Sequence, residues 1–347
     1  MAGQGELTAA EGPEVWTSAD VGDPRQLAEP FTPEEIAEMA AVVAAARERG
    51  IAAEAATADL FAWPCLAERA RRGLATLRDG PGLVYWTGLP VDRFDKEALR
   101  LVYWGLGLAI GKPVSQSAKG DMLGDVRDMS HIDPNVRAYQ NRNELTPHTD
   151  HTEVVGLMCL RDSREGGETP LASAPAIHNE ILRTRPDLLA ILYRGFRYHR
   201  RGEEQPGDDP ITPHRVPVFS RVGRQVSCRL VRPYIAAAAA ELGTPLSDAE
   251  TEALDLVQDL ARDPRFRLPL RLEPGSMVLF NNYTTLHERT PFVDWDEPDR
   301  KRHLVRMWLV PDHLRDVDPG IEVFTTRGGI ARRDAPARAY DWGVGGR

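Results

Sequence analysis

The sequence has 347 residues, of which 42% are hydrophobic and 27% are charged, and its formal net charge at pH 7 is -9. A chain of this length and composition can bury a large core. The acidic balance argues against a nucleic-acid partner, because phosphate backbones are bound by basic surfaces. No window approaches the roughly 20 apolar residues of a membrane span, and residues 1–12 lack the basic and apolar regions of a secretory signal. We therefore expect neither a nucleic-acid nor a membrane partner.

The first part of the chain predicts an arm followed by helices and one strand. Residues 1–30 are rich in Gly, Ala, Pro and acidic residues, so we expect a loose N-terminal arm. Thr32 then supplies an N-cap, Pro33 a first helical residue and Glu35 the glutamate of a capping box. The helix that they begin should end at Gly50. Further helices are predicted at about 64–78 and 96–110, and a strand at 83–87.

The later part of the chain alternates strands and helices. An apolar run at 154–160 predicts a core strand. Residues 202–213 are charged and rich in Pro and Gly, which indicates a loop beside the site or a lid. Ser247 and Glu250 have the spacing of a capping box. Helices are predicted at 176–183, 186–193, 235–242 and 248–262.

The cysteines are few and widely spaced. Cys65, Cys159 and Cys228 are an odd number without a Cys-x-x-Cys pair. This pattern predicts free thiols in a reducing cytoplasm and argues against a zinc site built from cysteines.

A short motif at His148 and Asp150 offers metal ligands. In an extended segment the side chains of these two residues share a face, because side chains alternate along a strand. Together with His287 they supply two imidazoles and one carboxylate, the facial triad that holds Fe(II) in non-haem oxygenases. A His-x-Asp motif alone is weak evidence, since most such pairs are hydrogen-bonded surface groups.

Two later segments strengthen the case for a site. The apolar run at 277–280 is followed by a turn at Asn281 and Asn282, and His287 begins the next element. A strand at 302–310 places Arg302 and Arg306 on one face, while both of its faces carry large apolar residues. Such a strand is buried, so its two arginines require anionic partners.

Five motifs carry a resemblance to a known family. They occur in the family's order and extend over about residues 83–311. On these motifs the chain resembles the taurine dioxygenase (TauD/TfdA-like) family of Fe(II)- and 2-oxoglutarate-dependent oxygenases, to which clavaminate synthase is also similar. The motifs are His148-Thr149-Asp150, Gly166-Gly167-Glu168-Thr169, Asn281-Asn282, Leu286-His287-Glu288-Arg289-Thr290-Pro291-Phe292 and the strand at 302–309.

The resemblance implies a fold and a reaction. We expect a mainly β fold with flanking helices, a double-stranded β-helix (jelly roll) of the clavaminate synthase-like type. Residues 31–347 would form one oxygenase domain with helical insertions. The implied reaction consumes O2, decarboxylates 2-oxoglutarate to succinate, and hydroxylates or otherwise oxidises a small molecule at an unactivated C–H bond.

The resemblance also implies roles for single residues. His148, Asp150 and His287 would be the iron ligands. The remaining roles concern 2-oxoglutarate, whose keto acid end chelates the metal and whose distal carboxylate would be bound by Thr169 and Arg302.

Arg306 matches a second arginine of the family, which lies close to the co-substrate or to an anionic group of the substrate. A guanidinium suits either role, because it pairs with a carboxylate through two hydrogen bonds and stays charged when buried. If Arg306 does not bind the co-substrate, an acidic substrate is favoured, and an amino-acid-like substrate also fits the family.

Other interpretations remain open at this point. Arg306 also fits as the buried ion-pair partner of an acidic residue, and His151 fits as a core or surface histidine. Arg137, Tyr139 and Asn141 would line the substrate pocket or pack against its edge. A zinc hydrolase can use the same ligand types, and a non-catalytic jelly-roll binding protein is a second alternative.

Overall fold

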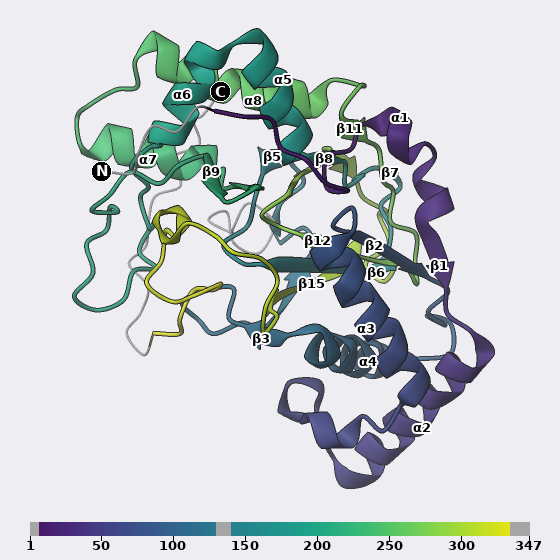
Figure 1. Cartoon of the computed structure of the whole chain (residues 1–347). Coiled ribbons are helices and arrows are strands. Elements are labelled where there is room, and N and C mark those ends of the chain that lie inside the picture. Colours follow the sequence, from purple (N-terminus) through teal and green to yellow (C-terminus); the bar gives the residue numbers. More distant parts are fainter. Residues whose placement is uncertain (1–6, 130–139, 334–347) are drawn as a thin grey trace.

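The computed structural model describes residues 7–129 and 140–333, which are built around two β-sheets (Figure 1). In the larger sheet β12 (Met277–Asn281) and β6 (Val154–Arg161) are neighbours, and β15 (His303–Val310) pairs with β6. This sheet is completed by β1 (Ala28–Pro30), β2 (Leu83–Thr87), β3 (Lys112–Val114) and β4 (Leu123–Val126). The four-stranded sheet has the order β11 (Arg267–Leu268), β8 (Leu171–Ser173), β13 (Thr285–Arg289), β5 (Leu145–His148). Two-stranded pairs are formed by β9 (Phe219–Val222) with β10 (Gln225–Cys228) and by β7 (Glu165–Gly166) with β14 (Phe292–Val293).

The large sheet separates two hydrophobic clusters. On β15, Leu304 and Trp308 belong to the cluster shared with the small sheet, whereas Val305 and Met307 belong to the other cluster. Alternate residues of β6 divide in the same way. The prediction that the strand at 302–310 is buried on both faces is therefore confirmed, and its arginine-bearing face is the one that looks towards the small sheet.

Three long helices cover the outer face of the large sheet. They are α2 (Pro33–Arg49), α3 (Pro64–Asp79) and α4 (Lys96–Ile110), which lie together on one side of the molecule (Figure 1). The predicted capping box of Thr32 and Glu35 is present at the start of α2, and Gly50 ends it with a φ of 64°. That left-handed conformation is the one in which glycine is favoured. All three predicted helices are confirmed.

The remaining helices lie near the small sheet. They are α5 (Ala174–Thr184), α6 (Pro186–Arg194), α7 (Arg232–Glu241) and α8 (Asp248–Arg262), with short 3-10 turns elsewhere at η2 (Ala53–Ala55), η3 (Ala58–Leu60) and η5 (Pro319–Ile321). Each of these helices overlaps a predicted one. Over the described residues the helices contain more residues than the strands, and the sheets with their flanking helices are consistent with the expected class. The helical additions cover both sheets.

The N-terminal segment differs from the expected loose arm. Its described part contains α1 (Ser18–Val21), η1 (Pro24–Leu27) and β1, which pairs in parallel with β2. Trp16 is only 3% exposed, and its indole N–H donates a hydrogen bond of 3.0 Å to the carbonyl of Pro81. Composition predicted a loose arm because this segment is rich in Gly, Ala, Pro and acidic residues, whereas the buried Trp16 and the pairing of β1 with β2 hold its described part against the domain.

Two further predictions concern the chain as a whole. Cys65, Cys159 and Cys228 are free thiols, as expected. Among the described residues, every helix is too short or too polar to cross a membrane.

Candidate metal centre

Strand pairing brings the two distant histidines together. His287 on β13 lies directly opposite His148 on β5, and it pairs on its other side with Leu171 of β8. The two imidazole rings have a centroid separation of 4.2 Å and an interplanar angle of 43°. Two histidines far apart in sequence thus become a cross-strand pair between β13 and the edge strand β5 of the small sheet.

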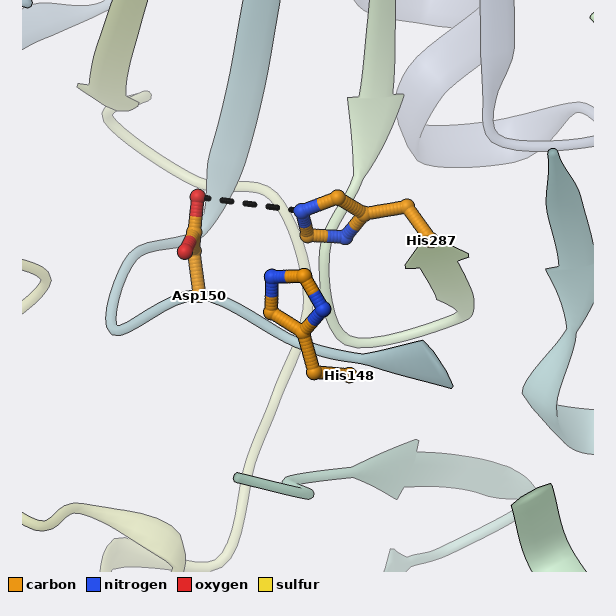
Figure 2. Close-up of side chains that lie close together, drawn as sticks. All are labelled: His148, Asp150 and His287. Atoms are coloured by element: carbon orange, nitrogen blue, oxygen red, sulfur yellow. Dashed lines mark ion pairs between the residues drawn. The ribbon is translucent and has the colours of Figure 1, made fainter. Parts of the chain in front are cut away.

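Asp150 completes the group from just beyond the end of β5. Its backbone is held by the side chain of Asn282, which accepts a hydrogen bond of 2.9 Å from the N–H of Asp150 and donates one of 2.7 Å to its carbonyl. One ligand atom from each of His148, Asp150 and His287 lies within 4.8 Å of the others. Figure 2 shows the three side chains directed toward one another. The strand ends earlier than the sequence suggested, but the expected convergence of the ligands is present.

The electrostatics leave the ligands in metal-binding forms. Desolvation lowers the pKa of His287 to about 3, and it lowers the pKa of His148 as well. Burial alone would raise the pKa of Asp150, but Arg306 and the two histidines hold it well below its usual range. The site therefore offers two neutral imidazoles and one carboxylate, as metal binding requires. His148 also donates from Nδ1 to the carbonyl of Thr146 at 2.7 Å, which leaves its Nε2 for a metal.

Arg306 and Trp308 contact the carboxylate of Asp150. Nη1 of Arg306 lies 3.3 Å from Oδ1 and 3.1 Å from Oδ2 of Asp150. The indole N–H of Trp308 donates to Oδ2 at 2.9 Å. Nε of Arg306 donates to Oε1 of Gln116 at 2.6 Å. Arg306 thus forms a buried ion pair with Asp150, which is one of the interpretations left open above.

Arg302 lies next to the turn that contains Thr169. Its side chain is buried, with only 2% of the residue exposed, and its guanidinium lies 5.0 Å from the centre of the Phe292 ring. Nη2 is 3.3 Å from the carbonyl of Gly167, whereas Nε and Nη1 have no hydrogen-bond partner among the described residues. A buried guanidinium with two unused donors is costly unless an anion binds it. The Nε and Nη1 donors of Arg302 are therefore suited to bind a carboxylate.

Gly167 approaches Arg302, and Thr169 follows it by two residues in the chain. A Cβ at Gly167, where φ is 76°, would lie 3.0 Å from Nε of Arg302, so only a glycine allows this approach without strain. Thr169 is buried, and it immediately precedes Pro170, whose carbonyl accepts from the N–H of Glu288 at 3.1 Å. Thr169 therefore lies beside the strand that carries His287.

Arg289 is a buried cation near His148 for which the sequence motifs predicted no role. Burial, and then the nearby charge of Arg302, lower its pKa to about 9. Nη2 of Arg289 donates to Oδ1 of Asn141 at 3.2 Å. The available signal was its position two residues after His287 on one strand, which predicts a shared face. Arg137 and Tyr139 lie outside the described residues.

His151 takes no part in the metal cluster. It is buried, and its ring lies 5.0 Å from those of Tyr234 and Phe324. This agrees with the interpretation of His151 as a core histidine.

Comparison with known proteins supplies a family. The model of the family described as "Taurine catabolism dioxygenase TauD, TfdA family" matches residues 43–308. The chain is 34% identical over 239 residues to FR-33289 synthase of Streptomyces rubellomurinus, a match that covers 67% of this chain and 70% of that protein. It is 30% identical over 164 residues to a uridine-5'-phosphate dioxygenase of Amycolatopsis sp., covering 43% of this chain and 52% of the relative.

A solved structure supports the fold. Asparagine oxygenase in complex with Fe(II), 2S,3S-3-hydroxyasparagine and succinate is similar with a TM-score of 0.63 at 17% sequence identity, and the match covers 82% of this chain and 93% of that one. The two sheets and their helices thus agree with the expected jelly roll.

Proposed function

Because the chain belongs to the TauD, TfdA family of dioxygenases, we propose that His148, Asp150 and His287 hold its catalytic iron. The protein is an Fe(II)- and 2-oxoglutarate-dependent dioxygenase that oxidises a small molecule while 2-oxoglutarate is decarboxylated to succinate. The observation that carries the ligand assignment is the convergence of three donor atoms within 4.8 Å. A zinc hydrolase and a non-catalytic binding protein find no support, since the matching family is one of dioxygenases.

The donor set fits Fe(II). Two imidazoles and one carboxylate occupy three of six positions and leave three open. When bound there, the metal would activate O2 and accept the keto acid end of 2-oxoglutarate. The fold keeps the imidazoles of His148 and His287 neutral and the carboxylate of Asp150 ionised, in a site that is largely removed from water.

For the distal carboxylate of 2-oxoglutarate we propose Arg302 and Thr169. The two unused donors of Arg302 support this role, as does the close approach of the Gly167 turn. Arg302 immediately precedes β15, and the strand pairing is irregular between His303 and Leu304, so Arg302 is set apart along the chain from Arg306, which contacts Asp150. That offset suits a molecule with an acid group at each end, one at the metal and one at Arg302.

For Arg306 the contacts favour a different role from the expected one. Its guanidinium spans both oxygens of Asp150 and reaches Gln116. We therefore propose that Arg306 supports the iron ligand and adds positive charge beside the metal, and that it does not bind the distal carboxylate.

We propose that the substrate is a small acidic molecule. Desolvation is the main cause of the lowered pKa of His148, and the charges of Arg306 and Arg289 lower it further. Both arginines therefore lie close enough to affect the metal site. Arg229 is also fully buried and donates to the backbone carbonyl of Asp150. Arg306 is paired with Asp150, and Arg229 lies 4.0 Å from Glu322, so the proposal rests on the buried cation of Arg289 near His148, which would attract an anionic group of the substrate. The relative named for uridine-5'-phosphate fits this class, whereas the name of asparagine oxygenase indicates an amino acid. We further propose a cytoplasmic location, which the free thiols support.

Succinate formation tests both parts of this proposal. The enzyme would be assayed with Fe(II), O2 and 2-oxoglutarate against phosphate esters, sulfonates and amino acids, each paired with a neutral ester or amide of the same skeleton. We expect an acid to support turnover and its neutral partner to fail. Equal turnover of a neutral partner would contradict the acidic class, and a substrate oxidised without 2-oxoglutarate would contradict the dioxygenase site.

A further inference from the structure

Trp308 makes a direct contact with the carboxylate of Asp150. Its indole N–H donates to Oδ2 at 2.9 Å. Trp308 is 2% exposed and Asp150 is also buried, so water competes little for this hydrogen bond. Trp308 follows Arg306 by two residues on β15, so the two side chains project from the same face of the strand.

The two donors act differently on the carboxylate. Arg306 lies at nearly equal distances from the two oxygens, 3.3 and 3.1 Å, so it does not distinguish between them. Trp308 contacts Oδ2 alone. Arg306 therefore contributes positive charge beside the carboxylate, whereas Trp308 favours one orientation of its two oxygens.

Direction matters because a carboxylate binds a metal through one oxygen or through both. Three ligands with one donor each leave three positions, which a keto acid and O2 require together. A second oxygen from Asp150 would take one of them. We infer that Trp308 is a positioning residue, which fixes the rotation of the Asp150 carboxylate so that it offers a single oxygen to the metal. This inference rests on the proposed role of Asp150 as an iron ligand.

The substitution Trp308→Phe isolates the N–H group. The guanidinium of Arg306 lies 4.9 Å from the centre of the Trp308 ring, so phenylalanine keeps an aromatic ring beneath it while removing the donor. We expect Fe(II) affinity, measured by anaerobic calorimetry, to fall about 10- to 100-fold, as for other partners of metal ligands. The visible absorption spectrum of the Co(II)-substituted protein should also change, because it reports the number of ligand atoms.

Trp104→Phe is the matched control. Trp104 is 5% exposed and donates a hydrogen bond of 2.9 Å to the carbonyl of Ala56, in the hydrophobic cluster on the other side of the sheet. This variant loses an equivalent buried hydrogen bond away from the metal, so its Fe(II) affinity and Co(II) spectrum should match those of the wild type. If Trp308→Phe behaves like Trp104→Phe in both measurements, the inference is overturned.

Two further experiments distinguish an error in the proposed ligand set from an error in the role of Trp308. If Asp150→Ala binds Fe(II) as tightly as the wild type, the proposed ligand set is wrong; if it binds weakly while Trp308→Phe does not, only the role of Trp308 is wrong. Should Trp308→Phe not fold, the wild-type protein with 15N-labelled tryptophan gives the answer. On addition of Zn(II) the indole N–H signal of Trp308 should shift and that of Trp104 should not, and an unmoved Trp308 signal would overturn the inference.

Discussion

His148 and His287 are held in the neutral form by the fold, because desolvation lowers the pKa of both side chains. A neutral imidazole binds a metal without first losing a proton. The hydrogen bond from Nδ1 of His148 to Thr146 also selects the tautomer with a free Nε2. Both ligands are thus prepared for a metal by their surroundings.

Removing either histidine should abolish turnover and leave the fold intact. In His148→Ala and His287→Ala the triad loses one of its three ligands, so Fe(II) binding should fail in calorimetry while the circular dichroism spectrum is retained. His151→Ala is the matched control, since His151 is buried one residue from Asp150 but lies outside the cluster. Undiminished activity of His148→Ala or His287→Ala at limiting iron would rule out the assignment.

Replacing Arg302 should weaken the binding of 2-oxoglutarate without destabilising the free protein. In Arg302→Met the distal carboxylate of 2-oxoglutarate loses a buried charged partner, a loss of about 3–5 kcal/mol, which corresponds to roughly 10²- to 10⁴-fold weaker binding. Without 2-oxoglutarate the variant should be at least as stable as the wild type, because two unpaired buried donors are removed. Titration of 2-oxoglutarate and thermal unfolding of the free protein measure the two effects. An unchanged affinity would exclude Arg302 from the co-substrate site.

Asp150 should also decide the kind of product. As the proposed iron ligand, its carboxylate would occupy the coordination position that a halide needs, and it would repel a second anion by charge. We expect a hydroxylated or otherwise oxidised product, even at high chloride concentration. Mass spectrometry of the wild-type reaction checks this, and a chlorinated product would refute the ligand role of Asp150.

At the level of elements, the end of β12 and the turn that leads to β13 connect the two sheets, and they carry two buried asparagines with different hydrogen bonds. Asn282 bonds to the backbone of Asp150 and also donates to the carbonyl of Thr152 at 2.7 Å. Asn281 instead donates to the carbonyl of Leu77 at 3.1 Å and accepts from the N–H of Tyr283. Of these two asparagines, only Asn282 therefore contacts the segment that carries Asp150.

Replacing these asparagines one at a time should separate stability from metal binding. Asn282→Ala and Asn281→Ala each remove buried hydrogen bonds, so each should lower the free energy of unfolding by about 1–3 kcal/mol. Only Asn282→Ala should also weaken Fe(II) binding, since it frees the backbone of Asp150. Denaturant unfolding and calorimetry provide the comparison, and equal Fe(II) affinities in the two variants would contradict the role given to Asn282.

For the whole molecule, the site joins the two sheets. His148 and His287 belong to the small sheet, while Arg306 and Trp308, which hold Asp150, belong to the large one. A metal bound by this group links both sheets, so ligand binding should stabilise the domain as a unit.

Metal and co-substrate should therefore raise the unfolding temperature. A ligand at 100 times its dissociation constant adds about 2.7 kcal/mol to the folded state, which corresponds to a shift of a few degrees in a chain of this size. A chelator should reverse the shift, and His287→Ala should show none. Calorimetric scans under anaerobic conditions, with and without Fe(II) and 2-oxoglutarate, make the measurement. A wild-type shift that survives in His287→Ala would place the stabilising metal elsewhere.

Local patterns in the sequence were sufficient for most elements. The capping boxes at Thr32 and at Ser247, and the apolar run at 154–160, predicted helices and a strand that the structure contains. These signals are local, because a helix cap and an apolar strand are each recognised from a few neighbouring residues. The His148, Asp150 and His287 set was also identified from residue types and order, although its geometry was not.

The tertiary structure alone decided which residues meet. The register that places His287 opposite His148, the docking of the segment around Trp16, and the pairing of Arg306 with Asp150 all join residues far apart in sequence. Such contacts depend on strand register and on the packing of whole sheets, which no window of sequence contains. The sequence by itself thus determined the chemical nature of the ligands, whereas the fold decided their partners, because a buried arginine or tryptophan acquires its role from the group it contacts.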